Sequence, residues 1–250
     1  MENSVLTYFI NRSPKYNASS AWVTDKMFIQ KIYQLSEANE NSTVLDVATG
    51  TGLIAKQFHG NVKKIVGVDI CESMVQQAKD QLDTLIISKI ENISLPDNSF
   101  DICVCRQGLQ FAELDETLKQ IYRILKPGGV TVLAHLTSYP EETEEDKKIT
   151  FKIQALREPV RKNYLSYDTI QKMLQTAGFK DIEIHPYITK ESINRWINHG
   201  AISEENKTAI IQCYHMAPSH YKEIHHIEIF DNDIFDDMHM TIVKAKKPQY

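Results

Sequence analysis

The sequence has no long apolar run, no basic block and no leader-like segment at its start. Nowhere do roughly 18 apolar residues follow one another, so we expect no membrane-spanning helix. The 33 Asp and Glu residues outnumber the 28 Lys and Arg residues, and no cluster of bases is long enough to follow a phosphate backbone. We therefore expect no nucleic-acid partner. Residues 1–13 have neither a basic start nor a long apolar stretch, and we expect a cytoplasmic protein.

The sequence also has few cysteines, and their spacing does not fit a metal site. Cys103 and Cys105 are separated by one residue, whereas the cysteine pairs of zinc sites are usually separated by about two to four. Alternate residues of a strand share one face, so these two thiols are expected on the same side of a sheet. For these two residues, and for Cys71 and Cys213, we expect buried, reduced thiols.

No Pro-, Gly- or Ser-rich stretch divides the 250 residues, so the sequence predicts one domain, residues 1–250. Residues 1–40 are expected to form an N-terminal helical segment. Residues 141–165, which are rich in charge, and residues 190–225, which are rich in aromatic residues and histidine, are expected to be lid insertions. The acids Asp231, Asp233, Asp236 and Asp237 predict a solvent-exposed hairpin turn.

Between residues 20 and 140 the period of the apolar residues alternates between two and about 3.6, which is typical of an α/β domain with a parallel sheet. The expected strands are residues 43–48, 63–70, 84–91, 100–107, 130–136, 180–188 and 239–247. The expected helices are residues 25–35, 71–82, 113–125 and 166–177, and Ser166 is the expected N-cap of the last one. Right-handed crossovers would give a doubly wound sheet, whose ligand site lies beyond the carboxyl ends of its strands.

One stretch, VLDVATGTGL at residues 44–53, has an acid before a glycine-rich turn. Gly50 and Gly52 allow a sharp turn and leave room for a ligand against the backbone. Asp46 would repel the pyrophosphate of a nicotinamide cofactor, so it favours a ligand with positive charge, such as S-adenosylmethionine. Asp69 ends the next expected strand, where a carboxylate can accept hydrogen bonds from ribose hydroxyls.

Four segments, VLDVATGTG, IVGVDICESM, LPDNSFDICVCRQGLQF and IYRILKPGG, occur in this order between residues 40 and 137. Together they resemble the class I S-adenosylmethionine-dependent methyltransferases, and within them the ubiquinone/menaquinone-biosynthesis type and its small-molecule relatives. The resemblance implies a Rossmann-like, doubly wound, seven-stranded sheet, mostly parallel with an antiparallel last strand, and a helical lid. It also implies S-adenosyl-L-methionine as cofactor and a small molecule as methyl acceptor.

Position by position, the resemblance implies which residues hold or surround the cofactor. They are Asp46, Ala48, Thr49, Gly50, Gly52, Asp69, Ile70, Met74, Ile90, Glu91, Arg106 and Gln107. Ala48 replaces a glycine of many relatives, which is tolerable if the backbone there stays extended. Lys89 stands where relatives usually carry an acid facing the adenine amino group, so adenine recognition would depend on the backbone of Ile90 or on Glu91.

Residues after the fourth and fifth expected strands are candidates for the acceptor side of the site. His135 is the candidate catalytic base, and a histidine held by a backbone partner is an equally good interpretation. The acceptor-side candidates are Tyr16, Trp22, Gln110, Trp196, Tyr214 and His215. Metal-dependent relatives carry acids at the positions of Arg106 and His135, and the histidines after residue 214 lack metal-ligand spacing. We therefore expect metal-independent methylation of O, C or N.

Two other functions remain open from the sequence. A nicotinamide-dependent oxidoreductase would also use a glycine-rich turn, although Asp46 disfavours it. A catalytically silent subunit with this fold would keep the cofactor residues without turnover. The sequence leaves the identity of the acceptor and the oligomeric state open.

Overall fold

The computed structural model describes residues 2–250, without the side chains of residues 2–4 and 167. Its strands are β1 (Thr43–Val47), β2 (Lys64–Asp69), β3 (Thr84–Ile87), β4 (Phe100–Arg106), β5 (Leu125–Leu136), β6 (Lys180–Ser192), β7 (Glu228–Ile229) and β8 (Ile234–Lys246). They form one sheet in the order β3-β2-β1-β4-β5-β8-β6, with β7 paired to β8. β1 to β5 are parallel, whereas β8 is antiparallel to its neighbours β5 and β6.

The predicted doubly wound sheet with an antiparallel last strand is confirmed. Seven strands were expected from the sequence, and eight are present among residues 2–250. The additional strand is β7, which has two residues and pairs with the start of β8. A strand of this length is too short to leave a period in the apolar residues.

The helices are α1 (Glu2–Arg12), α2 (Lys26–Leu35), α3 (Leu53–Phe58), α4 (Glu72–Val75), α5 (Leu114–Ile124), α6 (Glu144–Arg157), α7 (Tyr167–Thr176), α8 (Ile193–Ile197), α9 (Glu204–Met216) and α10 (Ser219–Ile224). Shorter 3₁₀ helices are η1 (Ser13–Ala18), η2 (Ala21–Val23), η3 (Lys79–Gln81), η4 (Ile90–Asn92) and η5 (Leu109–Phe111). Side chains cap two of the predicted helices. Asp25 accepts hydrogen bonds from the backbone at the start of α2, and Ser166 caps α7 as predicted.

The helix predicted over residues 71–82 is wrong in its length. α4 ends at Val75, and the chain continues through turns into η3. This path brings Ala78 against Gly52, where an added β-carbon would lie 2.6 Å from the Cβ of Ala78. Close packing against the turn after β1 overrides the helical spacing of the apolar residues here.

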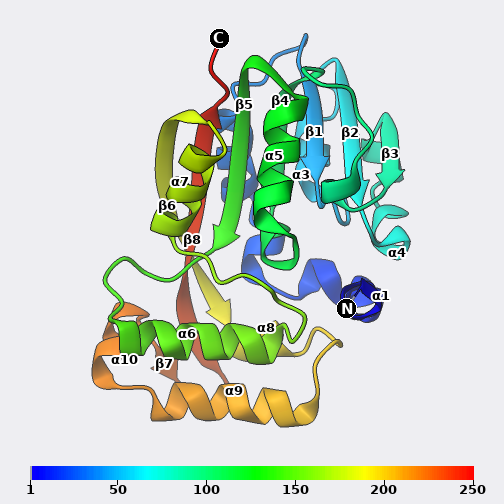
Figure 1. The fold of residues 1–250 in the computed structure, drawn as a ribbon. Coiled ribbons are helices and arrows are strands. Elements are labelled where there is room, and N and C mark those ends of the chain that lie inside the picture. The colour runs from blue at the N-terminus through cyan, green and yellow to red at the C-terminus, as the bar shows by residue number, and fades with distance from the viewer. Residues whose placement is uncertain (1) are drawn as a thin grey trace.

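The sheet and a helical region below it form the two parts of the molecule (Figure 1). In the upper part, α5 and α7 cover one face of the sheet, and their apolar residues share a core with Leu45 and Cys103. Val44 and Ile102 point to the other face and pack with α2 and α3. The lower part contains α6, α8, α9 and α10, which come from the two predicted insertions, and the lower ends of β6 and β8 reach into it.

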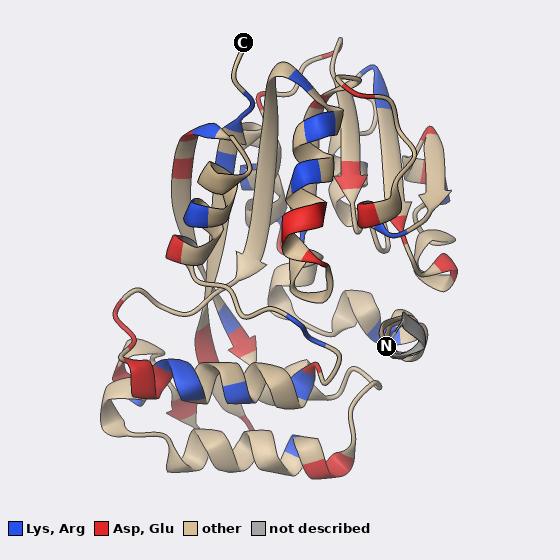
Figure 2. Cartoon of the chain, in the orientation of Figure 1, with Lys and Arg blue, Asp and Glu red and all other residues tan. Residues whose placement is uncertain are grey.

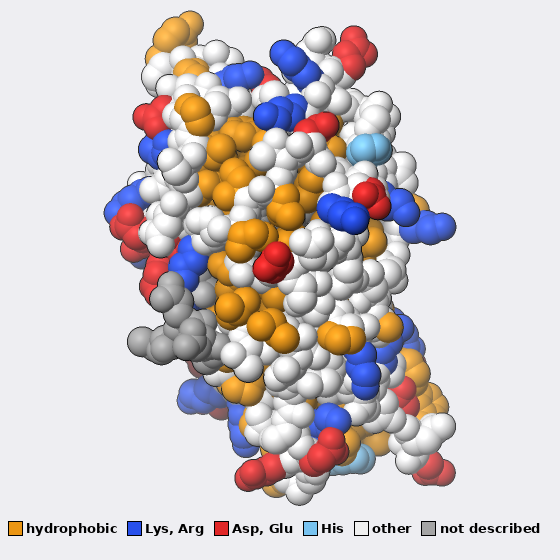
Figure 3. Space-filling model, turned by 90° about the vertical axis from the view of Figure 1, so that its right-hand side faces the viewer, with side chains coloured by type: hydrophobic (Ala, Val, Ile, Leu, Met, Phe, Trp, Pro, Cys, Tyr) orange, Lys and Arg blue, Asp and Glu red, His pale blue; other side chains and the backbone are white. Residues whose placement is uncertain are grey.

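The predicted burial of cysteine is confirmed for three thiols: Cys71, Cys103 and Cys105 are buried and free, and Cys213 is half-buried. Charged residues of both signs are interspersed along the chain (Figure 2). On the face that carries β3, hydrophobic side chains gather over the sheet-bearing part (Figure 3). No helix among residues 2–250 has the length and apolar character that a bilayer crossing requires.

The acids between residues 231 and 237 do not all lie in a solvated turn, as the sequence predicted. Asp231 is exposed between β7 and β8, whereas Asp236 is buried within β8. The carboxylate of Asp236 accepts a hydrogen bond from the Tyr214 hydroxyl at 2.7 Å and lies 3.0 Å from Nδ1 of His225. Nε2 of the same imidazole lies 3.1 Å from Glu142. The lower part therefore contains a buried polar network.

Candidate active site

A cavity of about 680 Å³ lies at the carboxyl ends of β1 to β4, beside α1. Parallel strands bring their carboxyl ends to one edge of the sheet, so residues that are distant in sequence meet there. Of the predicted cofactor residues, those on the cavity wall are Ala48, Gly50, Asp69, Ile70, Met74, Ile90, Glu91, Arg106 and Gln107. Of the predicted acceptor residues, Tyr16 is on the wall.

The turn between β1 and α3 has an unusual backbone. Ala48, Gly50 and Gly52 have φ values of +55°, +54° and +78°, in the left-handed region. The expectation of an extended backbone at Ala48 is therefore wrong, and this alanine is strained relative to glycine by about 1 kcal/mol. Its methyl group packs against Gly108, where an added β-carbon would lie 2.6 Å from the Cβ of Ala48. The loops after the neighbouring strands β1 and β4 thus fit closely together.

The two glycines of this turn have different surroundings. Gly50 lines the cavity, and a β-carbon added there would meet the Cε atom of Met74 at an ordinary contact distance of 3.4 Å. Gly52 lies off the cavity and packs against Ala78. The prediction of room for a ligand at the backbone fits Gly50, whereas Gly52 is needed for packing.

Asp46 and Thr49 lie beneath the turn and not on the cavity wall. Asp46 is 1% exposed, and its carboxylate accepts a hydrogen bond from the Thr49 hydroxyl at 2.7 Å. Burial raises the pKa of Asp46 to about 7, although the Thr49 hydroxyl and the charge of Arg106 oppose this shift. Asp46 therefore supports the turn from below, and at neutral pH its charge responds to charges brought into the cavity.

Asp69 ends β2 and lines the cavity. Its two carboxylate oxygens accept hydrogen bonds from the backbone N–H groups of Gly50 and Cys71, both at 2.9 Å. Burial raises the pKa of Asp69, and the backbone donors partly offset that shift. Because each carboxylate oxygen has two lone pairs, this fixed carboxylate can accept further hydrogen bonds from a ligand.

Apolar side chains form much of the remaining wall. Those on the sheet side include Ile70, Met74 and Ile90, and those of α1 are Val5, Leu6 and Phe9. The ring of Phe9 meets that of Phe111 edge-on, with centroids 5.0 Å apart. This role of α1 was not predicted from the sequence. Val5 and Phe9 are four residues apart, so an apolar stripe on one helical face was the available signal.

Lys89 and Glu91 line the cavity near the end of β3. The carboxylate of Glu91 accepts a hydrogen bond from the backbone N–H of Glu113 at 2.7 Å, which ties the loop after β3 to the start of α5. Ile90 is the first residue of η4 and is nearly buried. Both predicted alternatives for adenine recognition, the Ile90 backbone and Glu91, are thus adjacent to the cavity.

The end of β4 contributes two polar side chains, Arg106 and Gln107. Arg106 donates a hydrogen bond from Nη1 to the backbone oxygen of Val23 at 2.8 Å and lies over the Trp22 ring at 5.6 Å. Gln107 has a φ of +57° and accepts a hydrogen bond from Gln110 at 2.8 Å. Trp22 and Gln110 are buried behind the cavity wall and support the residues that form it.

Four predicted residues lie away from the cavity. His135 is fully buried, and neither of its ring nitrogens has a hydrogen-bond partner among residues 2–250. Burial, together with the charge of Arg161, lowers the pKa of His135 to about 3, so it accepts a proton poorly at neutral pH. Trp196 and Tyr214 are buried in the lower part, and His215 is exposed on α9. The catalytic and acceptor roles predicted for these residues do not fit this arrangement.

Residues 45–133 match a family described as a methyltransferase domain. The malonyl-[acyl-carrier protein] O-methyltransferase of Yersinia pestis is 30% identical over 109 residues, which are 42% of this chain and 41% of that protein. UbiE of Hydrogenovibrio crunogenus, a ubiquinone/menaquinone biosynthesis C-methyltransferase, is 30% identical over 179 residues, 60% of this chain and 70% of the relative. The chain belongs to the class I S-adenosylmethionine-dependent methyltransferases.

The fold of this methyltransferase is shared by solved structures. The YcgJ protein of Bacillus subtilis superposes with a TM-score of 0.81 at 20% sequence identity, over 89% of this chain and 98% of that one. The family resemblance predicted from the four sequence segments is confirmed, and S-adenosylmethionine is the cofactor of the methyltransferase.

The residues around the cavity fit this cofactor. Gly50 leaves the backbone open to a ligand, Asp69 has lone pairs for two hydroxyl groups, and the apolar side chains near β2 and β3 offer a surface for adenine. Asp46 beneath the turn and Asp69 on the wall are two acids whose negative charge suits a cationic ligand in the cavity. Across residues 2–250, no group of three or more His, Cys, Asp and Glu side chains is arranged to hold a metal ion.

Proposed function

We propose that this methyltransferase methylates a small-molecule acceptor within the same cavity and without a metal ion. The observation that carries the proposal is that the predicted cofactor residues Asp69 and Ile70 and the predicted acceptor residue Tyr16 line one continuous space. Its volume of about 680 Å³ lies within the range of small-molecule sites, roughly 300–1,000 Å³. The names of the relatives, a C-methyltransferase of quinone biosynthesis and an O-methyltransferase of malonyl-[acyl-carrier protein], support a small methylated group.

When bound, S-adenosylmethionine supplies a methyl group on a positively charged sulfur. In this proposal Asp69 accepts hydrogen bonds from both ribose hydroxyls, and Ile70, Met74 and Ile90 pack against adenine. Gly50 lets the amino-acid part of the cofactor lie against the backbone. Asp46 acts indirectly, because it holds the turn through Thr49 and places negative charge beneath it.

The chain also controls water and protons near the acceptor. Val5, Leu6 and Phe9 of α1 cover the cavity and exclude water, which favours an aligned approach of the acceptor. None of the described residues on the cavity wall is a histidine. We propose that the acceptor nucleophile is one that reacts without an imidazole base, such as an anion or a neutral amine.

We also propose the partner class, the location and the lid segment of this methyltransferase. The acidic balance of the chain supports the absence of a nucleic-acid partner, and a cytoplasmic location is inferred from the sequence. Lys162, within the first predicted lid insertion, lines the cavity, whereas no residue of the second insertion, 190–225, does so among the described residues. We propose the first insertion, and not the second, as a wall of the acceptor site.

Calorimetric titration with S-adenosylmethionine, S-adenosylhomocysteine and NAD⁺ tests the proposed function. We expect micromolar-scale binding of the first two and none of NAD⁺. Release of S-adenosylhomocysteine is then assayed with a panel of small phenols, carboxylates and amines. Binding of NAD⁺ without S-adenosylhomocysteine would identify an oxidoreductase instead. Cofactor binding without turnover on the whole panel would favour a catalytically silent subunit.

A further inference from the structure

Acids and bases both line the cavity: Asp69, Glu91 and Glu113 are the acids, and Lys89, Arg106 and Lys162 are the bases. Asp46 and Asp69 lie on the side of β1 and β2, where the cofactor is proposed to bind. Arg106, counted among the cofactor residues in the sequence, ends β4 next to Gln107 and shares the cavity wall with Tyr16, the predicted acceptor residue. A guanidinium on the wall of such a cavity favours an anionic group beside it.

Arg106 has no acid in direct contact, and the buried Asp46 acts on its charge without a hydrogen bond between them. Its side chain is nearly buried, at 8% exposure for the residue, and no carboxylate of residues 2–250 lies within 4.0 Å of it. Nη1 donates to the backbone oxygens of Val23 and Trp22. Nε and Nη2 donate no hydrogen bond within the described part of the chain, and neither atom is enclosed by protein. These two nitrogens can therefore donate to a ligand in the cavity.

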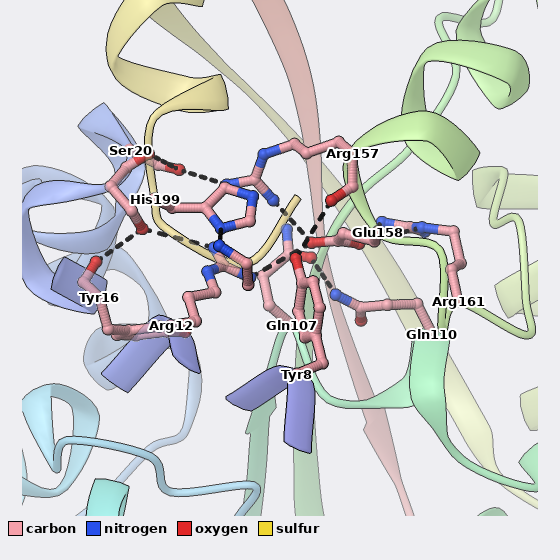
Figure 4. Close-up of polar contacts among 12 residues, drawn as sticks. Tyr8, Arg12, Tyr16, Ser20, Gln107, Gln110, Arg157, Glu158, Arg161 and His199 are labelled. Carbon is pink, nitrogen blue, oxygen red and sulfur yellow. Dashed lines mark hydrogen bonds and ion pairs between the residues drawn. The ribbon is translucent and has the colours of Figure 1, made fainter. Parts of the chain in front are cut away.

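More positive charge lies behind the acceptor side (Figure 4). Arg12, Arg157 and Arg161 surround the single carboxylate of Glu158, with N–O distances of 3.4, 2.7 and 2.6 Å. The guanidinium of Arg12 also lies 4.9 Å from the centroid of the Tyr16 ring, and Tyr16 lines the cavity. These three buried cations share a single carboxylate.

A buried guanidinium without an acid in direct contact opposes the binding of a second cation nearby, and the sulfonium of the cofactor is such a cation. An anionic group held by Arg106 removes this opposition. We propose that the acceptor carries an anionic oxygen group, a carboxylate in the simplest case, and that Arg106 binds it through Nε and Nη2. This assignment rests on the proposed function and specifies the acceptor class of the same site.

Acetate and acetamide test the assignment, because they have nearly the same size and differ in charge. The dissociation constants of S-adenosylmethionine and S-adenosylhomocysteine are measured at constant ionic strength with either compound present. In the parent protein, acetate should tighten binding of S-adenosylmethionine by roughly threefold to tenfold, and acetamide should not. The effect on S-adenosylhomocysteine should be smaller, because its sulfur is neutral.

Three variants complete the experiment. Arg106→Gln should abolish the acetate effect and, without any anion, should bind S-adenosylmethionine more tightly relative to S-adenosylhomocysteine than the parent does. Arg106→Lys keeps the charge and should retain part of the acetate effect. Lys148→Gln removes a charge from an exposed position of α6 and should behave as the parent. Circular dichroism and binding of S-adenosylhomocysteine verify that each variant is folded.

The experiment distinguishes failure of the anionic-acceptor assignment from failure of the proposed function. If both cofactors bind the parent and acetate has no effect, or has the same effect in Arg106→Gln, the assignment of an anionic acceptor is overturned and the proposed function stands. If neither cofactor binds the folded parent, the proposed function fails and the assignment fails with it.

Discussion

Carboxylates that are largely shielded from solvent occur both in the cavity and in the lower helical part, and their partners differ. In the lower part, Asp236 is matched by the hydroxyl of Tyr214 and by His225, whose other ring nitrogen meets Glu142. In the cavity, Asp69 is held by backbone N–H groups alone and faces open space, and Arg106 has no acid partner within the described residues. Charged groups that are buried without a full set of partners destabilise a fold, and binding sites are where such groups are retained. The comparison supports our proposal that the lower network is structural and that the cavity is the binding site.

The largest effect is expected on replacing Trp196 in the lower part, which should change stability without changing ligand binding in the cavity. Its indole is buried beneath the guanidinium of Arg157, 4.4 Å from the ring centroid. Trp196→Ala should lower the free energy of unfolding by about 3–5 kcal/mol, because it leaves a large cavity, and should leave binding of S-adenosylhomocysteine unchanged. Urea denaturation and calorimetry measure the two quantities.

Met216→Ala is the matched control for Trp196→Ala, because Met216 is 83% exposed in the same part of the molecule, and it should change neither quantity. Loss of turnover by Trp196→Ala at unchanged stability and unchanged binding of S-adenosylhomocysteine would restore Trp196 to the acceptor site.

The second effect concerns the charge on His225. Burial alone would lower the pKa of His225, but Asp236 and Glu142 raise it to about 9. Since the folded pKa exceeds the unfolded value, the stabilisation is complete below about pH 6.5 and is lost as the pH rises to about 9; it amounts to about 3 kcal/mol. Denaturation curves at several pH values should show this loss.

His225→Gln should be less stable than the parent at pH 6 and should lack the decrease between pH 6.5 and 9. A parent protein whose stability is constant over that range would show that His225 is neutral in the folded state.

The third effect concerns the carboxylate of Asp69 in the cavity and its contribution to cofactor affinity. Asp69→Ala removes the carboxylate proposed to bind the ribose and should weaken both S-adenosylmethionine and S-adenosylhomocysteine by about 1–3 kcal/mol. Asp80→Ala removes an exposed acid from the nearby η3 and should have no effect on binding. Equal affinities for the parent and a folded Asp69→Ala variant would remove Asp69 from the cofactor site.

The smallest effect concerns backbone strain at Ala48. Ala48→Gly should raise the free energy of unfolding by up to about 1 kcal/mol, because glycine adopts a φ of +55° without strain. Asn98→Gly provides a control at an exposed loop residue with a φ of +50°, where no contact with Gly108 is at stake. A loss of stability at Ala48→Gly alone would show that packing of the methyl group outweighs the strain.

Much of the fold follows from short-range patterns in the sequence. The apolar periods predict the strands around the cavity, because a buried strand and an amphipathic helix bury different sets of residues. The positions of Asp69 and Gly50 at the cavity were predictable for the same reason, because each residue lies at a fixed place relative to the end of a strand. The early end of α4 was not predictable from the sequence, because it depends on contact between Ala78 and Gly52, which lies in a different loop.

The errors at the site have a common physical cause. His135, Trp196 and Tyr214 were chosen for chemistry that their side chains can perform, but residue type does not show how deeply a side chain is buried. The Trp196 ring packs against Arg157, and the guanidinium of Arg12 pairs with Glu158. Such pairs are far apart in sequence and leave no periodic pattern.

A crystal structure of the protein with S-adenosylhomocysteine tests the central claim most directly, because it locates the ligand relative to both regions. We predict that the ribose hydroxyl oxygens lie within about 3.2 Å of the Asp69 carboxylate. We also predict that adenine packs between Ile70 and Ile90 and that the lower network is unchanged. Binding in the lower part, or binding in the cavity with no contact to Asp69, would contradict the assignment of the cofactor site.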